Sequence, residues 1–338
     1  MTETSQDKQG LHLVVVMPAL NEEKTVADTI RRIPRQISGI ASVQVVVVND
    51  GSTDSTVAEA LGAGAVVVSH GRRQGVGAAF QTALPQALSM GADLIVSIDS
   101  DGQFDPAHIP DLILPVLEGS ADFATASRFA DPALIPQMPA LKLWGNRAMS
   151  RLISGLVGQR FYDVSCGMRC YSRKAALHLN LIASFTYTQE VFLNLAYKKL
   201  RMVEVPLRIQ GVRTHGQSRV ASNLWKYGVN TLSIIFRCYR DYYPMRFFGR
   251  LAAAMIVPGV ALEVFLLIHH LLTGQFSPHK WAGFAGAALL ALGLLLFMMG
   301  LVGDMLNRHR MYLEELLFHA RNQAAHNGRK NGPDGGPA

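Results

Sequence analysis

Two aspartates separated by one residue are the first group in the sequence whose spacing indicates chemistry. Asp99 and Asp101 follow a short apolar run and precede Gln103, in the segment SIDSDGQFDP. Two carboxylates on one turn, with an amide oxygen beside them, can hold a hard divalent cation, so Mg²⁺ or Mn²⁺ is expected here. Such an ion would neutralise a diphosphate leaving group as the bond to it breaks. Surface turns are often rich in aspartate, so the motif becomes informative only through its context.

Polar segments also follow the first two apolar runs, in VVVMPALNEE and VVVVNDGSTD. A carboxylate such as Asp50 can accept a hydrogen bond from a base N–H, which favours a nucleobase over a phosphate as its ligand. Asn21 and Asp54 have a second interpretation, as caps of the helices that follow.

The elements that must position these residues alternate along the chain. Apolar runs at 11–17, 43–48, 65–69 and 94–98 predict strands, and helical spacing at 22–33, 54–61 and 75–90 predicts helices between them. This order predicts an α/β fold with a mostly parallel sheet and flanking helices. Ligands of such sheets bind beyond the carboxyl ends of the strands, where the polar segments should meet.

The last third of the chain contains two apolar stretches, Leu251–Leu272 and Ala282–Gly303. Each is long enough to cross about 30 Å of hydrocarbon as a helix. Arginines before the first and after the second indicate a hairpin with both ends in the cytoplasm. A buried pair of core helices is the alternative. The mixed apolar and basic segment Asn223–Tyr243 predicts an amphipathic helix on the membrane surface, or else an ordinary packing helix.

Composition agrees with a soluble domain that carries a membrane part, because 49% of the residues are hydrophobic and 17% are charged. Residues 1–150 hold ten basic and sixteen acidic side chains, whereas residues 151–338 hold twenty-two and nine. The acidic half suits a cation and the basic half suits anionic membrane lipids.

Nucleic acid is not an expected partner, because the positive charge clusters around the membrane segments. Three cysteines without paired spacing argue against a disulfide framework.

These patterns together predict a domain order. We expect a disordered N-terminus at 1–10, a catalytic domain at 11–222, an amphipathic juxtamembrane helix at 223–250, two transmembrane helices within 251–303, a cytoplasmic helix at 304–320 and a disordered tail at 321–338. The first ten residues lack the apolar stretch of a signal peptide. The catalytic domain is therefore expected in the cytoplasm, at the inner membrane.

Several motifs taken together also carry a family resemblance. VVVMPALNEEKTV, VVVVNDGSTDST, SIDSDGQFDP, ASRF, NRAMSRLIS and DVSCGMRCYSRKAAL are among the stretches that match, and they run from Val14 to Val220. The sequence resembles the family 2 glycosyltransferases of GT-A fold, and within them the polyprenyl-phosphate glycosyltransferases similar to dolichyl-phosphate mannose synthase.

The resemblance implies roles for particular residues. The nucleotide pocket would be lined by Pro18, Leu20, Glu22 and Asp50, and the metal would be held by Asp99, Asp101 and Gln103. The lipid phosphate and the diphosphate would be surrounded by Arg128, Arg147, Ser150 and Arg219. Two departures are Asn49, where many relatives have Asp, and Val76, where many have Lys. Arg72 or Arg73 is then left to supply the missing positive charge.

The segment DVSCGMR has two interpretations. Asp163 and Arg169 can form a wall below the sugar, or they can form a structural ion pair. Cys166 is expected to be a small packed residue. Glu190 either touches a sugar hydroxyl or belongs to a network at the start of a helix.

The expected function is transfer of a hexose, with inversion, from a nucleotide-diphosphate sugar of the GDP-mannose or UDP-glucose type to polyprenyl phosphate. A phosphate acceptor is already anionic near neutral pH, so no general base is required. The first alternative is a glycosyltransferase with a hydroxyl acceptor, a glycolipid or polysaccharide, which would need Asp163 or Glu190 as a base. The second is a membrane protein that binds a nucleotide sugar without turnover. The sequence leaves open whether the chain forms a homo-oligomer.

Overall fold

The computed structural model describes residues 10–181, 187–210 and 224–330. They divide into two compact units. The first contains the described residues up to Ile234 and those from Leu316 onward, and the second spans Ile235–Glu315. Disorder was expected at 1–10 and 321–338, and of these segments residues 1–9 and 331–338 lie outside the described residues.

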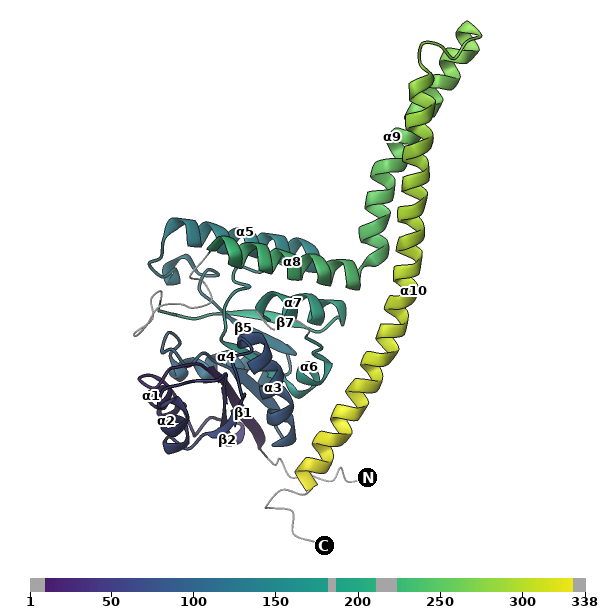
Figure 1. The fold of residues 1–338 in the computed structure, drawn as a ribbon. Coiled ribbons are helices and arrows are strands. Elements are labelled where there is room, and N and C mark those ends of the chain that lie inside the picture. Colours follow the sequence, from purple (N-terminus) through teal and green to yellow (C-terminus); the bar gives the residue numbers. More distant parts are fainter. Residues whose placement is uncertain (1–9, 182–186, 211–223, 331–338) are drawn as a thin grey trace, which may run out of the picture. The chain divides into compact units, whose positions relative to one another are not determined.

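The first unit is built on a sheet with the strand order β3-β2-β1-β4-β6-β5-β7 in the described part of the chain. Figure 1 labels β1, β2, β5 and β7 of this sheet. The strands are β1 (Leu11–Ala19), β2 (Ile40–Asn49), β3 (Val66–Ser69), β4 (Leu94–Ser97), β5 (Phe123–Ser127), β6 (Arg169–Ser172) and β7 (Met202–Pro206). The first four strands pair in parallel, as predicted, and β5 pairs in parallel with β7. Only β6 runs antiparallel among these described strands, between β4 and β5. The prediction of an α/β fold with a mostly parallel sheet is confirmed.

Helices cover the sheet and explain its apolar strands. The described α-helices of this unit are α1 (Val26–Arg31), α2 (Thr56–Gly62), α3 (Val76–Ser89), α4 (Ile109–Leu117), α5 (Ala140–Val157), α6 (Arg173–His178), α7 (Thr188–Tyr197), the first part of α8 (Leu224–Tyr242) and the last part of α10 (Lys280–Lys330). Leu13 and Val15 join a core cluster with residues of α1 and α4. Their neighbours Val14 and Val16 are also buried, since α3 packs on β1 and β2. A strand buried on both faces has no polar alternation, which is why these runs are continuously apolar.

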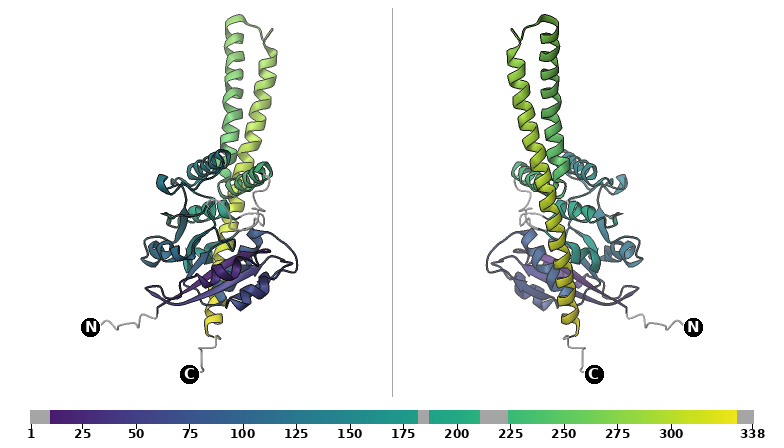
Figure 2. Two further views of the ribbon diagram at one scale, coloured as in Figure 1. Left: turned by 90° about the vertical axis from the view of Figure 1, so that its left-hand side faces the viewer. Right: turned by 90° about the vertical axis from the view of Figure 1, so that its right-hand side faces the viewer.

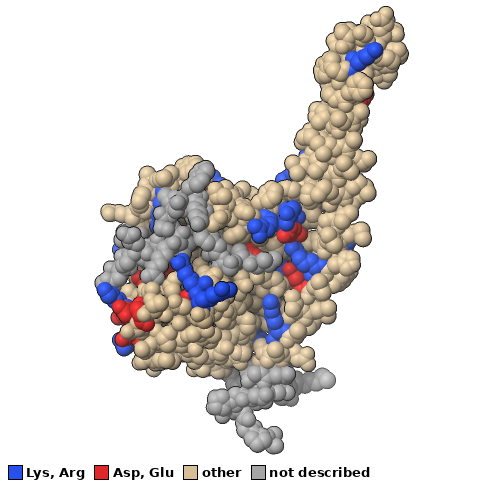
Figure 3. All heavy atoms as spheres, in the orientation of Figure 1, with Lys and Arg blue, Asp and Glu red and all other residues tan. Residues whose placement is uncertain are grey.

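The second unit contains α9 (Pro244–Thr273) and the first part of α10 (Lys280–Lys330). Both helices are long and apolar enough to cross a membrane, and they include the two predicted spans. They run side by side (Figure 2), and the face of the hairpin seen in Figure 3 carries few charged side chains. Leu271, Phe284 and Leu295 are 73%, 80% and 64% exposed, which argues against the alternative of buried core helices. The two helices fit a transmembrane hairpin.

Glycines allow the two helices to approach closely. A Cβ atom added at Gly293 would lie 2.5 Å from Ile256 Cγ1, and one added at Gly303 would lie 2.8 Å from Pro244 Cβ. Small residues at such contacts are typical of helix pairs in membranes, where close packing replaces the hydrophobic effect as the driving force.

Two expected boundaries differ in the structure. The juxtamembrane segment 223–250 is divided at Tyr243, whose ψ of 54° is not helical, and Pro244 begins α9 at a position that tolerates proline. The segments 304–320 and 321–330 form one helix with the second span, although disorder was expected from residue 321. Packing explains the difference, because Arg321 Nη1 donates hydrogen bonds to Leu179 O at 2.8 Å and Asn180 Oδ1 at 2.9 Å.

A hairpin predicts that the α9–α10 loop and the catalytic unit lie on opposite sides of the membrane. We expect the Gln275→Cys variant to react with an impermeant maleimide added to intact cells, and the Ser120→Cys variant to react only after lysis. The wild-type chain is the matched control. Its three cysteines are buried, and burial raises the pKa of the Cys166 thiol to about 12. Labelling of both variants from the same side would rule out the hairpin.

Candidate active site

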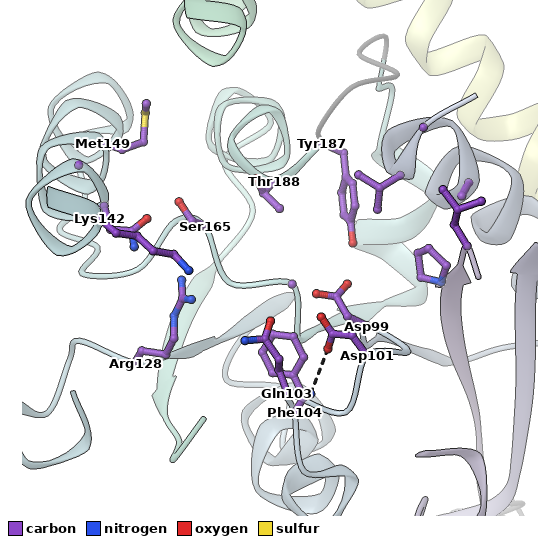
Figure 4. A pocket seen from close by; sticks show the side chains of 18 of the residues that line it. Asp99, Asp101, Gln103, Phe104, Arg128, Lys142, Met149, Ser165, Tyr187 and Thr188 are labelled. Carbon is purple, nitrogen blue, oxygen red and sulfur yellow. Dashed lines mark hydrogen bonds between the residues drawn. The ribbon is translucent and has the colours of Figure 1, made fainter. Parts of the chain in front are cut away.

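A cavity of about 910 Å³ lies beyond the carboxyl ends of β1, β2 and β4 (Figure 4). Its walls come from the turns after these strands, from α5, from the start of α7 and from α8. Eight of the residues predicted from the sequence line it: Pro18, Leu20, Glu22, Asp50, Asp99, Asp101, Gln103 and Arg128. The parallel strands bring together segments that are far apart in the chain, as the sequence analysis expects.

The turn that carries the two aspartates is fastened to the turn after β1. Ser100 Oγ donates a hydrogen bond to Pro18 O at 2.9 Å, and Thr25 Oγ1 donates one to Ser100 O at 2.7 Å. Within the turn, Gln103 N donates to Asp101 Oδ1 at 3.0 Å. The position of the carboxylates is therefore set by the sheet and by the neighbouring turn together.

Asp99 and Asp101 lie next to one another at one side of the cavity in Figure 4. A Cβ atom added at Gly167 would come within 2.7 Å of Asp99 Oδ2, so only glycine leaves room for the carboxylate in this position. The Tyr187 hydroxyl points toward Asp99 from above. Burial raises the pKa of Tyr187, and the charge of Asp99 raises it further, so this hydroxyl stays protonated.

The donor set fits a divalent cation that is only partly ligated by protein. Within the described ranges, no group of three or more His, Cys, Asp or Glu side chains has the arrangement of a complete metal site. Mg²⁺ commonly binds one or two carboxylates and completes its octahedron with water and substrate phosphates. Asp99 and Asp101 supply such a pair of hard oxygen ligands, and Gln103 lines the same cavity.

Asp50 holds the segment that leads into α3. Its Oδ1 atom accepts a hydrogen bond from Gln74 N and its Oδ2 atom accepts one from Gly75 N, both at 2.8 Å. Arg73 stands directly before these two amides and lines the cavity, whereas Arg72 does not. Asp50 lines the cavity too, but two of its acceptor positions are already used by this segment. Of the two arginines considered from the sequence, Arg73 is thus the one that faces the cavity.

Neither Asp54 nor Asn21 occupies the cap position of a helix. Asp54 stands one residue before Ser55, the N-cap of α2, and its Oδ1 accepts a hydrogen bond from Thr56 N at 3.1 Å in the first turn. Asn21 Oδ1 instead accepts from Thr53 N at 2.8 Å, so this residue ties the turn after β1 to the turn after β2. Asn21 has a φ of 52°, a left-handed backbone conformation that asparagine adopts more readily than most residues.

Arg128 forms a forked ion pair with Asp163. Arg128 Nε lies 2.6 Å from Asp163 Oδ2, and Arg128 Nη2 lies 2.8 Å from Asp163 Oδ1. The aspartate is 1% exposed, whereas the arginine lines the cavity. Of the two interpretations of Asp163, the ion pair with Arg169 is wrong, because the partner of Asp163 is Arg128. The pair fixes the guanidinium in one orientation at the cavity wall.

Glu204 binds the backbone at Asp163 through two hydrogen bonds. The two Glu204 carboxylate oxygens accept hydrogen bonds from Tyr162 N at 2.8 Å and from Asp163 N at 2.7 Å. Burial raises the pKa of Glu204, and the nearby charge of Asp163 also raises it. These contacts fix the backbone of residues 162 and 163 and, through it, the ion pair.

Arg169 is fully buried and holds in place the part of the cavity wall between the aspartates and the Arg128–Asp163 pair. Its guanidinium donates hydrogen bonds to Cys166 O at 2.8 Å, Val164 O at 3.0 Å and Thr188 O at 2.9 Å. It also lies over the Phe192 ring at 5.1 Å. The bonds hold the loop before β6 and the start of α7, which contribute Ser165, Gly167, Tyr187 and Thr188 to the cavity. Arg169 is therefore a positioning residue.

Lys142 is a cavity residue that sequence reasoning missed. It comes from the first turn of α5, and in Figure 4 its ammonium approaches the Arg128 guanidinium, across the cavity from the aspartates. The only sequence signal is its place five residues before Arg147 in an amphipathic helix. The same side of the cavity continues in apolar residues of α5 and α8: Leu141, Trp144, Met149, Leu152 and Leu232.

Other residues singled out from the sequence lie elsewhere. Arg147 is exposed on α5 and is not among the residues that line the cavity. Ser150 is buried, and its Oγ accepts a hydrogen bond from Val164 N at 3.3 Å. Glu190 is buried in α7 and is also not among the residues that line the cavity. Arg219 falls outside the described residues.

Comparison with known proteins decides the family. Residues 14–179 match the family described as glycosyl transferase family 2. An uncharacterised protein of Methanocaldococcus jannaschii is 32% identical over 200 residues, which cover 58% of this chain and 80% of that protein. The chain belongs to glycosyltransferase family 2. The resemblance found in the sequence is confirmed, and the protein is an enzyme of the glycosyltransferase class.

Two further relatives have names that describe an activity. The UDP-N-acetylglucosamine–dolichyl-phosphate N-acetylglucosaminyltransferase of Methanococcus voltae is 29% identical over 216 residues, 58% of this chain and 84% of that protein. The undecaprenyl-phosphate 4-deoxy-4-formamido-L-arabinose transferase of Pseudomonas aeruginosa is 24% identical over 326 residues, 90% and 89% of the two chains. The fold is shared with glucosyl-3-phosphoglycerate synthase from Mycobacterium tuberculosis, solved with Mn²⁺, UDP and phosphoglyceric acid. That match has a TM-score of 0.53 and 24% identity over 69% of this chain and 80% of that chain.

The Arg128–Asp163 pair generates a prediction for this glycosyltransferase. Replacing Asp163 with Asn removes the counter-charge of Arg128 in a buried setting, which costs about 3 kcal/mol in comparable cases. We expect the melting temperature of the solubilised Asp163→Asn variant to fall by several degrees and sugar transfer to fall at least about tenfold. Asp28→Asn is the control, because Asp28 is exposed on α1. Wild-type melting and activity in Asp163→Asn would contradict the assigned role.

Proposed function

We propose that this chain transfers a hexose, with inversion, from a nucleotide-diphosphate sugar to polyprenyl phosphate at the cytoplasmic face of the membrane. The observation that carries the proposal is the polarity of the cavity. Two carboxylates form one side and two cations form the other, and the cationic side continues into apolar side chains. A metal-bound diphosphate suits the first side, and a phosphate with a long apolar tail suits the second.

Donor binding is assigned to the strand-end turns. Pro18, Leu20, Glu22 and Asp50 would contact the nucleotide, with Arg73 near the diphosphate. Asp99 and Asp101 would hold Mg²⁺ or Mn²⁺, with Gln103 beside them. When bound, the ion stabilises negative charge on the departing diphosphate. The carboxylates fix where that charge develops, because their turn is fastened to the turn after β1.

Acceptor binding is assigned to Arg128 and Lys142. A guanidinium and an ammonium can hold a phosphate through charge-assisted hydrogen bonds and leave one of its oxygens directed at the sugar. Beside them, Leu141 and Trp144 are each 66% exposed and line the cavity. Exposed apolar side chains of this size favour contact with an isoprenoid chain or with the membrane surface.

The same contacts weigh against a hydroxyl acceptor. That reaction needs a carboxylate base at the sugar, and the two bases suggested by the sequence are Asp163 and Glu190. Neither lines the cavity, and both Asp163 oxygens bond to Arg128. Two relatives whose names include dolichyl-phosphate or undecaprenyl-phosphate transferase support the phosphate acceptor. The arginines that flank the hairpin support the cytoplasmic side for the catalytic unit.

The metal assignment predicts the effect of Asp101→Asn. The amide keeps an acceptor for Gln103 N and removes the anionic ligand, so the fold should persist while transfer falls at least about a hundredfold, equivalent to about 2.7 kcal/mol. Asp105→Asn is a matched control from the next residues of the same loop, outside the cavity lining. Transfer from a radiolabelled donor is measured with and without EDTA. Wild-type rates in EDTA would disprove a metal-dependent reaction.

The acceptor assignment predicts a selective effect of Lys142→Ala. We expect the Michaelis constant for polyprenyl phosphate to rise about tenfold, equivalent to about 1.4 kcal/mol, while that for the donor changes less than about twofold. Arg151→Ala, an exposed cation on the same helix, is the control. Arg147→Ala in the same assay tests the role that the family resemblance implies for this arginine. An unchanged constant in Lys142→Ala, or preference of the wild type for a hydroxyl acceptor, would reject the assignment.

A further inference from the structure

An aromatic cluster builds the corner where α8 ends and α9 begins. The Phe236 and Phe247 rings meet edge to face with centroids 5.1 Å apart. The Tyr239 ring lies 5.7 Å from Tyr243 and 6.4 Å from Phe247. Tyrosines with an apolar ring and a polar tip are typical of the boundary between hydrocarbon and head groups. The apolar stretch of α9 starts immediately afterwards, at Leu251.

Two arginines project from this corner. Arg246 and Arg250 are exposed and lie one helical turn apart on α9. The Arg246 guanidinium lies 5.1 Å from the centre of the Tyr243 ring, and Arg250 Nη1 donates a hydrogen bond to Tyr239 Oη at 3.0 Å. One guanidinium thus lies over a tyrosine ring and the other is bonded to a tyrosine hydroxyl, both just before the apolar stretch of α9.

Neither arginine has a carboxylate partner within the described ranges of the chain, whereas nearby arginines do. Arg240 Nε lies 2.8 Å from Asp241 Oδ1, and Arg308 Nη2 lies 3.6 Å from Asp304 Oδ2. Arg246 and Arg250 therefore carry charge that is not balanced by a carboxylate within these residues, directly before the apolar stretch of α9. Within the described residues, this lack of a carboxylate partner distinguishes Arg246 and Arg250 from other arginines in the basic second half of the sequence.

We propose that Arg246 and Arg250, together with the Tyr239 hydroxyl, bind the phosphodiester head group of an anionic phospholipid. Side chains at i and i+4 on a helix lie on one face, so both guanidinium groups can reach the same phosphate. The guanidinium fork matches phosphate oxygens, and basic residues next to a membrane span attract anionic lipids.

A polyprenyl phosphate carries a similar phosphate group. We favour a phospholipid because the polyprenyl phosphate already has a proposed site in the cavity. The cavity has cations of its own in Arg128 and Lys142, and neither Arg246 nor Arg250 is among the residues that line it. The corner site is therefore assigned to a lipid that is bound without being consumed.

The test compares two double variants of the full-length chain in nanodiscs of phosphatidylcholine titrated with phosphatidylglycerol. Arg246→Gln combined with Arg250→Gln removes the proposed site. Arg240→Gln combined with Arg308→Gln removes the same charge from arginines that have carboxylate partners. Native mass spectrometry counts the phosphatidylglycerol retained at each concentration. At roughly fivefold per arginine, we expect the first pair to weaken binding about 30-fold and the control pair less than about threefold.

Three results would overturn the proposal. Equal weakening in both pairs would mean that only net charge matters, and no weakening in the first pair would mean that the lipid binds elsewhere. Displacement of phosphatidylglycerol by equimolar polyprenyl phosphate, with a raised Michaelis constant for polyprenyl phosphate in the first pair, would assign the site to the acceptor. Tyr239→Phe checks the same site with little risk to folding, and we expect it to weaken phosphatidylglycerol binding about threefold.

Discussion

The wall of the cavity depends on the hydrogen bonds of one buried guanidinium, that of Arg169. A charge without access to water is tolerated only when its hydrogen bonds are satisfied, and this one requires three carbonyl oxygens in fixed places. Those carbonyls belong to the loop before β6 and to the first residue of α7. Because the same segments supply Gly167 and Tyr187 to the cavity, the need to satisfy one buried cation sets the shape of the wall that faces Asp99.

The two sides of the cavity are positioned by different means. The carboxylates stand on a turn at the end of a parallel strand, so the sheet register fixes them directly. The two cations come from two other elements: Arg128 follows β5 and is oriented by Asp163, and Lys142 is carried by α5. Under the proposed function, the donor side is thus fixed by the sheet, whereas part of the acceptor side is carried by a helix.

Sequence reasoning found the parts of the site that local patterns encode. The apolar runs and the polar turns after them place Asp50, Asp99 and Asp101 at one sheet edge without knowledge of long-range pairing. The partner of Asp163 is different, because it depends on the antiparallel insertion of β6 between β4 and β5, which no short-range periodicity reveals. Lys142 escaped notice since a lysine on an amphipathic helix is ordinarily a solvated residue. The extension of α10 past residue 320 was missed because it is stabilised by packing on α6, not by an apolar pattern.

The close approach of α9 and α10 limits what the membrane part can do. At Gly293 and Gly303 the space for even one more carbon atom is taken by the opposite helix. Two helices in such contact leave no room between them for a hydrated sugar, so within the described residues the hairpin is a tightly packed pair of helices and its own interior is not a channel. This packing fits the role of a membrane anchor.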